Sequence, residues 1–323
     1  MAQIQGTCDP RFEKFRTLFQ GFLDAGEEVG ASLTVNLSGE NVVDLYGGHA
    51  NAERTRPWTC DTIVPVASLT KTVSALAVLM LVESGAIASV HDKVPKYWPE
   101  FAANGKEAVE IRHLLSHTSG VAGWEDEARM SEFITPAPLP GSGGGAGAMP
   151  PGFKPGPLFM KAIGNPAKSP GFCQTRAWRG GEQGVSNGYG NARALDTILS
   201  NITLAGGEDD DEKKKYLLSK PTVDLIFEEQ ARGADLAVGQ NIRWGIGYGL
   251  SGDGRDATWV DDRLPVGGRI AYWGGSGGSL GIMDVDRKLT ITYAMNVRST
   301  ILIGNTASTA YLKAIYEALG VEI

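Results

Sequence analysis

A short segment at the start of an apolar run combines a nucleophile and a base at a fixed spacing. Ser68-Leu69-Thr70-Lys71 precedes an apolar stretch. If the stretch is helical, a spacing of three puts the Ser68 hydroxyl and the Lys71 amine on one face, within mutual reach. A helix N-terminus offers N–H groups and a positive dipole end, which suit a developing oxyanion. A lysine partly removed from water can supply a neutral amine that accepts a proton. The pattern predicts nucleophilic catalysis by Ser68 with Lys71 as base.

The Ser-x-x-Lys spacing alone is weakly specific, because a serine that caps a helix and a surface lysine give the same letters. The surrounding sequence narrows its meaning. The run VPVASLTKT at residues 64–72, the apolar run that ends at Gly85 and HLLSHTSG at residues 113–120 resemble the serine β-lactamase and penicillin-binding-protein-like superfamily. The nearest branch is that of the class C-related carboxylesterases and acyltransferases, including the lovastatin-type transesterases.

Further segments extend the resemblance over roughly residues 10–130 and 172–320. They comprise YWPEF with Gly105-Lys106, Trp178-Arg179, Ser186-Asn187-Gly188, Asn191-Ala192-Arg193 and WGIGYG at residues 244–249. The resemblance implies an α+β chain with the β-lactamase/transpeptidase-like fold. In that fold an antiparallel sheet is flanked by helices, and here the helical region is expected to be truncated.

The resemblance also implies a third motif on the edge strand that faces the serine, written Lys-Thr-Gly or a variant. Trp273-Gly274-Gly275 occupies that place. The backbone N–H of Ser276 would then complete an oxyanion hole with that of Ser68. A tryptophan in place of the lysine removes the charge that helps to hold a β-lactam carboxylate and offers an aromatic wall. Neutral esters, thioesters or acyl chains therefore suit the site better than penicillins, although a plain core role for Trp273 remains the alternative.

Two other patterns are interpreted as structural. Residues 274–278 fit Gly-x-Ser-x-Gly around Ser276, but the nucleophile elbow of α/β-hydrolases needs a strand followed by a helix. Here strands are expected on both sides, so Ser276 is not the expected nucleophile. His113 and His117 are expected to bond the backbone beneath the site. The scattered cysteines and carboxylates form no metal set, and no cofactor is expected.

The second motif of the family, Tyr-x-Asn or a variant, has no clear counterpart. No tyrosine occurs between Tyr97 and Tyr189, and residues 135–171 hold nine glycines and nine prolines. Such a composition is not expected to form a regular helix or a central strand, so the segment is interpreted as a linker or flap. Tyr189-Gly190-Asn191 fits the letters, but its neighbours match the later segment that begins the next helix. Tyr189 is thus a catalytic candidate, with a structural role as the alternative.

Hydrophobic periodicity predicts the elements that position these residues. The chain is divided into an N-terminal part with the Ser-x-x-Lys helix (1–134), the Gly/Pro-rich segment (135–171) and a C-terminal part with sheet strands and a closing helix (172–323). Apolar residues lie all around the helix predicted for 70–85, so it is expected to be buried. The other predicted helices span about 10–22, 110–116, 191–204 and 306–319, and the strands 31–36, 41–46, 269–273, 280–285 and 289–296.

Composition excludes several classes of partner. The 323 residues are 42% hydrophobic and carry a net charge of −7, with no basic cluster longer than residues 213–215. Nucleic acid is therefore not an expected partner. No apolar run approaches the length of a membrane span or a signal peptide, and three cysteines form no disulfide framework. A cytoplasmic protein with a small-molecule substrate is expected, and its oligomeric state stays open.

These observations favour a serine hydrolase or acyltransferase that acts on esters or thioesters through an acyl-enzyme on Ser68. The missing tyrosine keeps a second hypothesis open, in which a catalytically impaired relative binds a ligand without turnover. A β-lactamase or peptidase is the third hypothesis, and Trp273 in place of the family's lysine argues against it.

Overall fold

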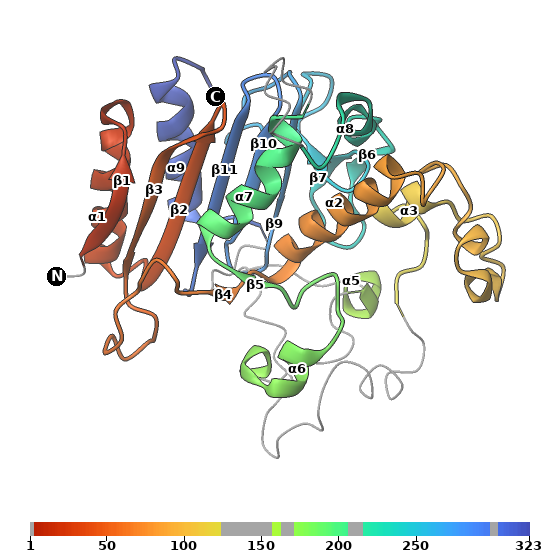
Figure 1. Ribbon diagram of the computed structural model, residues 1–323, viewed down its shortest axis with the longest axis horizontal. Helices are drawn as coiled ribbons and strands as arrows, with labels where there is room; N and C mark the ends of the chain where they lie inside the picture. Colours follow the sequence, from red (N-terminus) through yellow and green to blue (C-terminus); the bar gives the residue numbers. More distant parts are fainter. Residues whose placement is uncertain (1–2, 124–156, 163–170, 206–215, 298–302) are drawn as a thin grey trace.

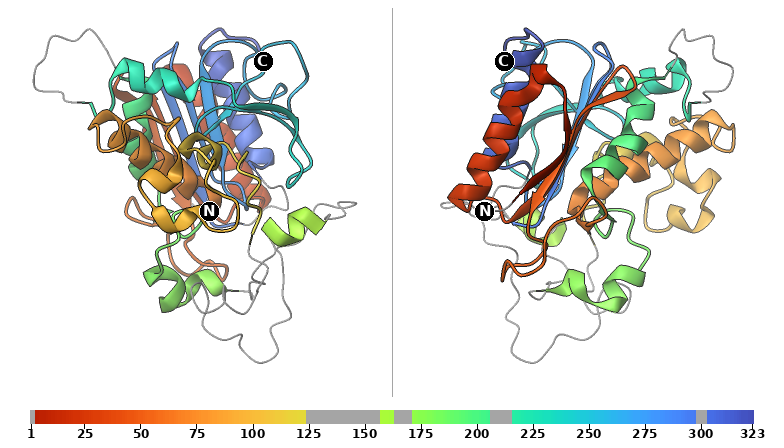
Figure 2. Two further views of the ribbon diagram at one scale, coloured as in Figure 1. Left: turned by 90° about the vertical axis from the view of Figure 1, so that its right-hand side faces the viewer. Right: turned by 60° about the vertical axis from the view of Figure 1, so that its left-hand side comes forward.

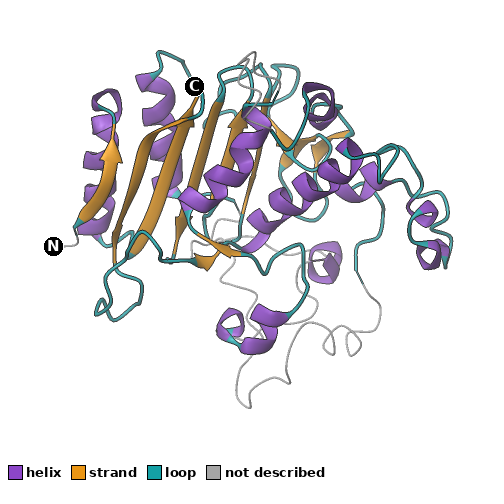
Figure 3. Ribbon diagram, viewed as in Figure 1, coloured by secondary structure: helices purple, strands orange, loops and turns teal. Residues whose placement is uncertain are grey.

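The computed structural model describes residues 3–123, 157–162, 171–205, 216–297 and 303–323. Within them an antiparallel nine-stranded sheet, ordered β1-β3-β2-β11-β10-β9-β8-β7-β6, forms the centre of the molecule (Figures 1 and 3). Its strands are β1 (Ile4–Cys8), β2 (Gly30–Leu37), β3 (Glu40–Gly48), β6 (Ala231–Ala234), β7 (Asn241–Trp244), β8 (Gly249–Leu250), β9 (Ile270–Gly274), β10 (Leu280–Asp284) and β11 (Leu289–Met295). A separate pair joins β4 (Val64–Pro65) to β5 (Tyr189–Gly190).

Helices cover both faces of the sheet. One face carries α1 (Glu13–Ala25) and α9 (Thr306–Ala318), and the other carries α2 (Thr70–Glu83) and α7 (Ala192–Thr203), as the right panel of Figure 2 shows. The two central strands β2 and β11 are consequently buried along nearly their whole length. The remaining helices are α3 (Ile111–Leu115), α5 (Pro157–Ala162), α6 (Arg176–Gly180), α8 (Lys220–Ile226) and the 3-10 turns η1 (Pro10–Phe12), η2 (Ala67–Leu69), η3 (Val94–Lys96), η4 (Pro99–Ala102) and η5 (Phe172–Gln174).

The predicted α+β class is confirmed. The phenylalanines of α1 point into the core because they recur every three or four residues, with Phe15 and Phe19 both 1% exposed. The two apolar runs at 31–36 and 41–46 form the β2–β3 hairpin, and the last three predicted strands are β9, β10 and β11. Within the described residues, no helix combines the length and the apolar character that crossing a membrane requires.

Two predictions about the helices are wrong. The α2 helix is not buried all around: Met80 is 37% and Leu81 47% exposed, because only one side of the helix packs against the sheet layer. A six-residue helix, α5, lies inside the segment for which no regular helix was expected, and its proline stands at the first position, where proline is tolerated. The rest of residues 135–171 lies outside the described residues, apart from Gly171.

A layer of buried polar side chains lies between α7 and the sheet. The hydroxyl of Ser32 accepts a hydrogen bond from the Ala192 N–H at 3.0 Å, and that of Thr292 donates to the Ala192 carbonyl at 2.8 Å. Asp196 lies in the same layer, 1% exposed, and its Oδ1 has no hydrogen-bond partner among the described residues. Burial, together with the charge of Asp44, raises the pKa of Asp196 to about 8. The side chain is therefore protonated at neutral pH.

Asp196→Asn is expected to be more stable than the wild type, by a margin that grows as the pH rises. The folded state holds the Asp196 proton more tightly than the unfolded chain, whose pKa is 3.8. The wild type therefore loses stability between about pH 4 and pH 8, by at most about 1.4 kcal/mol per pH unit. Asparagine has no proton to lose, so its advantage should widen from pH 5 to pH 8 in urea unfolding experiments. Parallel curves for the two proteins would contradict this assignment.

Candidate active site

The predicted nucleophile and base are brought together where η2 passes into α2. Ser68 and Lys71 are both half-buried, and the Lys71 Nζ donates hydrogen bonds to the Ser68 Oγ at 2.9 Å and to the Val185 carbonyl at 3.0 Å. Leu69, fully buried between them, anchors the start of the helix in the core. The spacing of three thus places an amine in contact with the hydroxyl that it would deprotonate.

The backbone before Ser68 is strained. Ala67 has φ +47°, in the left-handed region that residues with a Cβ rarely adopt. Such strain persists only where the surroundings enforce it, and it is concentrated at functional sites. Gly275 lies directly against this bend, since a Cβ there would come within 2.1 Å of the Val66 carbonyl oxygen. A glycine is therefore required where β9 ends beside the serine.

Residues 184–190 run alongside the start of α2. The Val66 N–H donates to the Gly188 carbonyl at 3.0 Å, and the Gly188 N–H donates to the Thr70 hydroxyl at 2.9 Å. These bonds present the Val185 carbonyl to Lys71 as a second acceptor. No pattern in the sequence predicts this contact, although Ser186-Asn187-Gly188 belongs to the resemblance and lies in the same segment.

The Trp273-Gly274-Gly275 motif ends β9 and leads into a tight turn that carries Ser276. The Gly275 N–H donates to the Ser279 carbonyl at 2.8 Å and closes the turn before β10 begins. Because Gly275 touches the bend before Ser68, the turn and the nucleophile segment lie side by side. Strands on both sides of Ser276 agree with the interpretation that it is not a nucleophile elbow.

An aromatic cluster stands beside this turn. Trp273 and Trp244 have ring centroids 4.7 Å apart, and His117 lies 4.6 Å from Trp244 and 6.1 Å from Trp273. The Trp244 indole N–H donates to Asp235 at 3.3 Å. Although His117 keeps exposed surface, desolvation by the surrounding protein and the positive charge of Lys71 lower its pKa to about 4. The cluster is thus uncharged at neutral pH. No local pattern in the sequence indicates that Trp244 and His117 lie beside Trp273.

The two histidines differ in role. His113 accepts a hydrogen bond from the Glu110 N–H at 3.2 Å and helps to cap α3, which confirms the structural role expected for it. His117, in a left-handed conformation with φ +60°, instead lies against the rings of the two tryptophans, tilted by 38° to Trp244 and by 30° to Trp273. The contacts that the structure shows for His117 are thus with aromatic rings, and not the backbone hydrogen bond that was expected.

Tyr189 lies on β5, and its hydroxyl donates a hydrogen bond to the carbonyl of Cys173. Asn191 caps α7, its Oδ1 accepting from the Ala194 N–H at 2.9 Å. Tyr189 and Asn191 therefore make structural hydrogen bonds, which agrees with the structural role given as the alternative for Tyr189. A catalytic role for Tyr189 stays a prediction. Within the described parts of the chain, no group of three or more histidine, cysteine or acidic side chains is placed to hold a metal ion.

The chain is similar to known proteins whose names describe them as esterases or β-lactamases. The Beta-lactamase family model matches residues 15–148. The esterase/β-lactamase LipL of Mycobacterium tuberculosis is 33% identical over 121 residues, 38% of this chain and 28% of that protein. The esterase EstB of Burkholderia gladioli is 40% identical over 99 residues, 30% of this chain and 25% of that protein. The matched region thus spans about a quarter of the length of these curated relatives.

Solved structures resemble the chain over almost its full length. A family VIII carboxylesterase shares 26% identity with a TM-score of 0.80, covering 98% of this chain and 100% of that one. A penicillin-binding protein homolog from Caulobacter crescentus shares 26% identity with a TM-score of 0.82 and the same coverage. Simvastatin synthase of Aspergillus terreus, at 15% identity and a TM-score of 0.62, shares the fold over 97% of this chain and 98% of its own. Residues 15–148 thus match the Beta-lactamase family model, and almost the whole chain shares its fold with a carboxylesterase and a penicillin-binding protein homolog.

Proposed function

We propose that this protein is a serine hydrolase or acyltransferase that acts on esters or thioesters. The observation that carries the proposal is the 2.9 Å contact between the Lys71 Nζ and the Ser68 Oγ at the start of a helix. Lys71, in its neutral form, takes the hydroxyl proton as the Ser68 Oγ attacks the carbonyl carbon. The N–H groups of Ser68 and Ser276 stabilise the oxyanion. Lys71 then returns the proton to the leaving group, and an acyl-enzyme ester remains on Ser68.

Deacylation uses the same pair in reverse. Lys71 accepts a proton from water or from an acceptor alcohol, whose oxygen attacks the acyl-enzyme carbonyl, and the proton returns to the Ser68 Oγ when the new acid or ester leaves. With no tyrosine between residues 97 and 189, one proton-transfer group of the resembled family has no counterpart there. An aryl oxide leaves without full protonation, so we expect aryl esters to acylate the enzyme faster than alkyl esters.

The aromatic cluster supports the choice of an ester over a β-lactam. Trp273 stands where the resembled family carries a lysine, and it packs with Trp244 and His117 in an uncharged cluster. The two tryptophans are largely buried, with Trp273 7% and Trp244 6% exposed. A substrate carboxylate would meet no positive charge from these three side chains. EstB, whose name describes it as an esterase, favours the same substrate class, whereas the name of LipL gives both activities. The cytoplasmic location expected from the sequence remains a prediction.

Active-site labelling tests the proposal. The protein is incubated with a fluorophosphonate probe, and the modified peptide is identified by mass spectrometry. We expect one labelled residue, Ser68, together with steady release of p-nitrophenolate from a short-chain p-nitrophenyl ester. Faster release in the presence of an acceptor alcohol would demonstrate acyl transfer.

Other outcomes select the alternative functions. A burst of one equivalent without steady turnover would identify a catalytically impaired protein with a binding role. Turnover of a chromogenic cephalosporin in preference to the ester would identify a β-lactamase. Labelling at a residue other than Ser68 would contradict the proposed nucleophile.

A further inference from the structure

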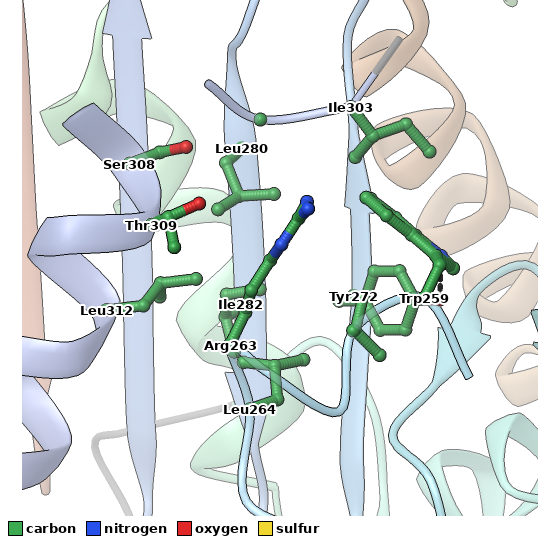
Figure 4. Close-up of a pocket in the computed structure, with 12 residues that line it drawn as sticks. Trp259, Arg263, Leu264, Tyr272, Leu280, Ile282, Ile303, Ser308, Thr309 and Leu312 are labelled. Atoms are coloured by element: carbon green, nitrogen blue, oxygen red, sulfur yellow. Dashed lines mark hydrogen bonds between the residues drawn. The ribbon is translucent and has the colours of Figure 1, made fainter. Parts of the chain in front are cut away.

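The turn that carries Ser276 is also held from the side opposite the nucleophile, by the segment that leads into α9. A Cβ on Gly274 would lie 2.3 Å from the Ile303 Cγ2, and one on Gly278 would lie 2.8 Å from the Asn305 Nδ2. Figure 4 shows Ile303 with side chains of α9 around a hollow that Leu280 of β10 also lines. The turn at residues 275–279 is thus packed between the bend at Ala67 and the start of α9.

Asn305 joins this packing to a buried hydrogen-bond chain. Its Oδ1 accepts from the Ser308 N–H at 2.8 Å and caps α9, while its Nδ2 donates to the Tyr293 hydroxyl at 3.2 Å. The Tyr293 hydroxyl in turn donates to the carboxyl group of Glu28. The Asn305 side-chain amide therefore lies against the turn at Gly278 and caps the start of α9. It is also the last member of the hydrogen-bond chain that begins at Glu28.

Glu28 is an unusual residue for its position, between α1 and β2. It is 1% exposed, and its Oε2 has no hydrogen-bond partner among the described residues. Burial, with a smaller contribution from Glu27, raises the pKa of Glu28 to about 7, and the hydrogen bond from Tyr293 opposes this shift. Burying an acid costs free energy. No described hydrogen bond joins Glu28 to Ser68 or Lys71, so the proposed proton transfers do not account for it.

The ring of Tyr311 provides a contrast within the same cluster. It lies 5.6 Å from the Tyr293 ring and 1% exposed, and it stacks on Phe15 at 4.9 Å. Its hydroxyl has no hydrogen-bond partner within the described residues. Two buried tyrosines therefore share one environment, but only Tyr293 is joined by hydrogen bonds to Asn305 and Glu28.

We propose that Glu28, Tyr293 and Asn305 are positioning residues for the oxyanion turn. Glu28 fixes the Tyr293 hydroxyl, which fixes the Asn305 amide against Gly278, and the turn then presents the Ser276 N–H toward Ser68. An oxyanion donor contributes fully only if it is in place before charge develops, because reorganisation during the reaction costs free energy. This inference rests on the proposed function, since it assigns these three residues to the same acyl-transfer site.

Two variants interrupt the hydrogen-bond chain from Glu28 to Asn305 at different atoms. Tyr293→Phe removes the hydroxyl, and Asn305→Ser removes the amide but keeps an oxygen that caps a helix as well as asparagine does. For each we expect kcat for the p-nitrophenyl ester to fall about 10-fold or more, with KM nearly unchanged, since a misplaced donor acts on the transition state. Rates are normalised to the fraction of Ser68 labelled by the fluorophosphonate, so that misfolded protein does not count.

A matched variant controls the experiment. Tyr311→Phe removes a buried hydroxyl from the same cluster without breaking the hydrogen-bond chain from Glu28 to Asn305. It should retain kcat within about twofold, since the hydrogen bonds of that chain remain. Thermal unfolding establishes that each protein is folded at the assay temperature, and if Tyr293→Phe does not fold, Asn305→Ser decides.

The outcomes separate this inference from the proposed function. Lower kcat in Tyr293→Phe and Asn305→Ser, with normal kcat in Tyr311→Phe, supports the positioning role. If the wild type is labelled at Ser68 and the variants that break the chain keep full kcat, the positioning role is wrong and the proposed function stands. An equal fall in Tyr311→Phe would also overturn it, because general loosening of the core would then be the cause. A wild type without labelling at Ser68 overturns both.

Discussion

Ser68→Ala is expected to lower kcat for a p-nitrophenyl ester by about 10⁴-fold or more and to abolish fluorophosphonate labelling. The reason is that no covalent intermediate can form once the Oγ is removed. What remains of the site, the oxyanion N–H groups and the aromatic cluster, can only bind the ester and polarise its carbonyl. KM should therefore change much less than kcat. The measurement is steady-state kinetics with in-gel detection of the probe.

Ser84→Ala serves as the control for this variant. Ser84 ends the same helix that begins beside Ser68, and its hydroxyl donates to the Leu81 carbonyl at 3.1 Å on the exposed side. Loss of that hydroxyl should leave kcat and labelling unchanged. A Ser68→Ala protein that keeps its activity, together with a Ser276→Ala protein that loses it, would show that the Gly-x-Ser-x-Gly pattern holds the nucleophile instead.

The parts of the fold that local sequence determines were predictable. The spacing of Phe15 and Phe19 defines α1 because a helix repeats every 3.6 residues, and the β2–β3 hairpin follows from two apolar runs around Ser38-Gly39. The contact between Ser68 and Lys71 is of the same kind, since it depends only on the geometry of one helical turn. These features needed no knowledge of distant residues.

The rest of the candidate site depends on strand order and on side chains far apart in the sequence. Trp244 meets Trp273 because β7 and β9 flank β8, and Val185 reaches Lys71 because β5 pairs with β4. Neither arrangement has a local signal. The buried position of Glu28 is likewise invisible in the sequence, where an acid after a helix is normally solvated.

The exposed side of α2 is a case in which a clear local pattern in the sequence gives a wrong prediction. Its apolar residues predict burial on every side, but Leu81 is 47% exposed while Leu79 is fully buried. Hydrophobicity around a whole helix reports what the sequence could bury and not what covers it. The structure was needed to show which side of α2 faces α7 and the sheet.

Lys71→Met is expected to lower kcat by about 10³- to 10⁴-fold, since a base that removes the nucleophile's proton contributes on this scale. Methionine keeps much of the aliphatic side chain but cannot accept a proton. Labelling of Ser68 should slow by a similar factor without being abolished, because the hydroxyl remains. The rate constant of fluorophosphonate labelling, measured as a function of time, separates this result from that of Ser68→Ala.

Lys71→Arg distinguishes a base from a positive charge. A guanidinium keeps its proton at any accessible pH, so this variant should be as impaired as Lys71→Met although it retains the charge beside Ser68. Lys96→Met is the control, because Lys96 is exposed and pairs with Asp92 at 2.8 Å away from the site. Full activity in Lys71→Arg would mean that Lys71 contributes only its charge, and the proton of Ser68 would then need another acceptor. Equal loss in both Lys71 variants, with normal kcat in Lys96→Met, assigns the proton transfer to the Lys71 amine.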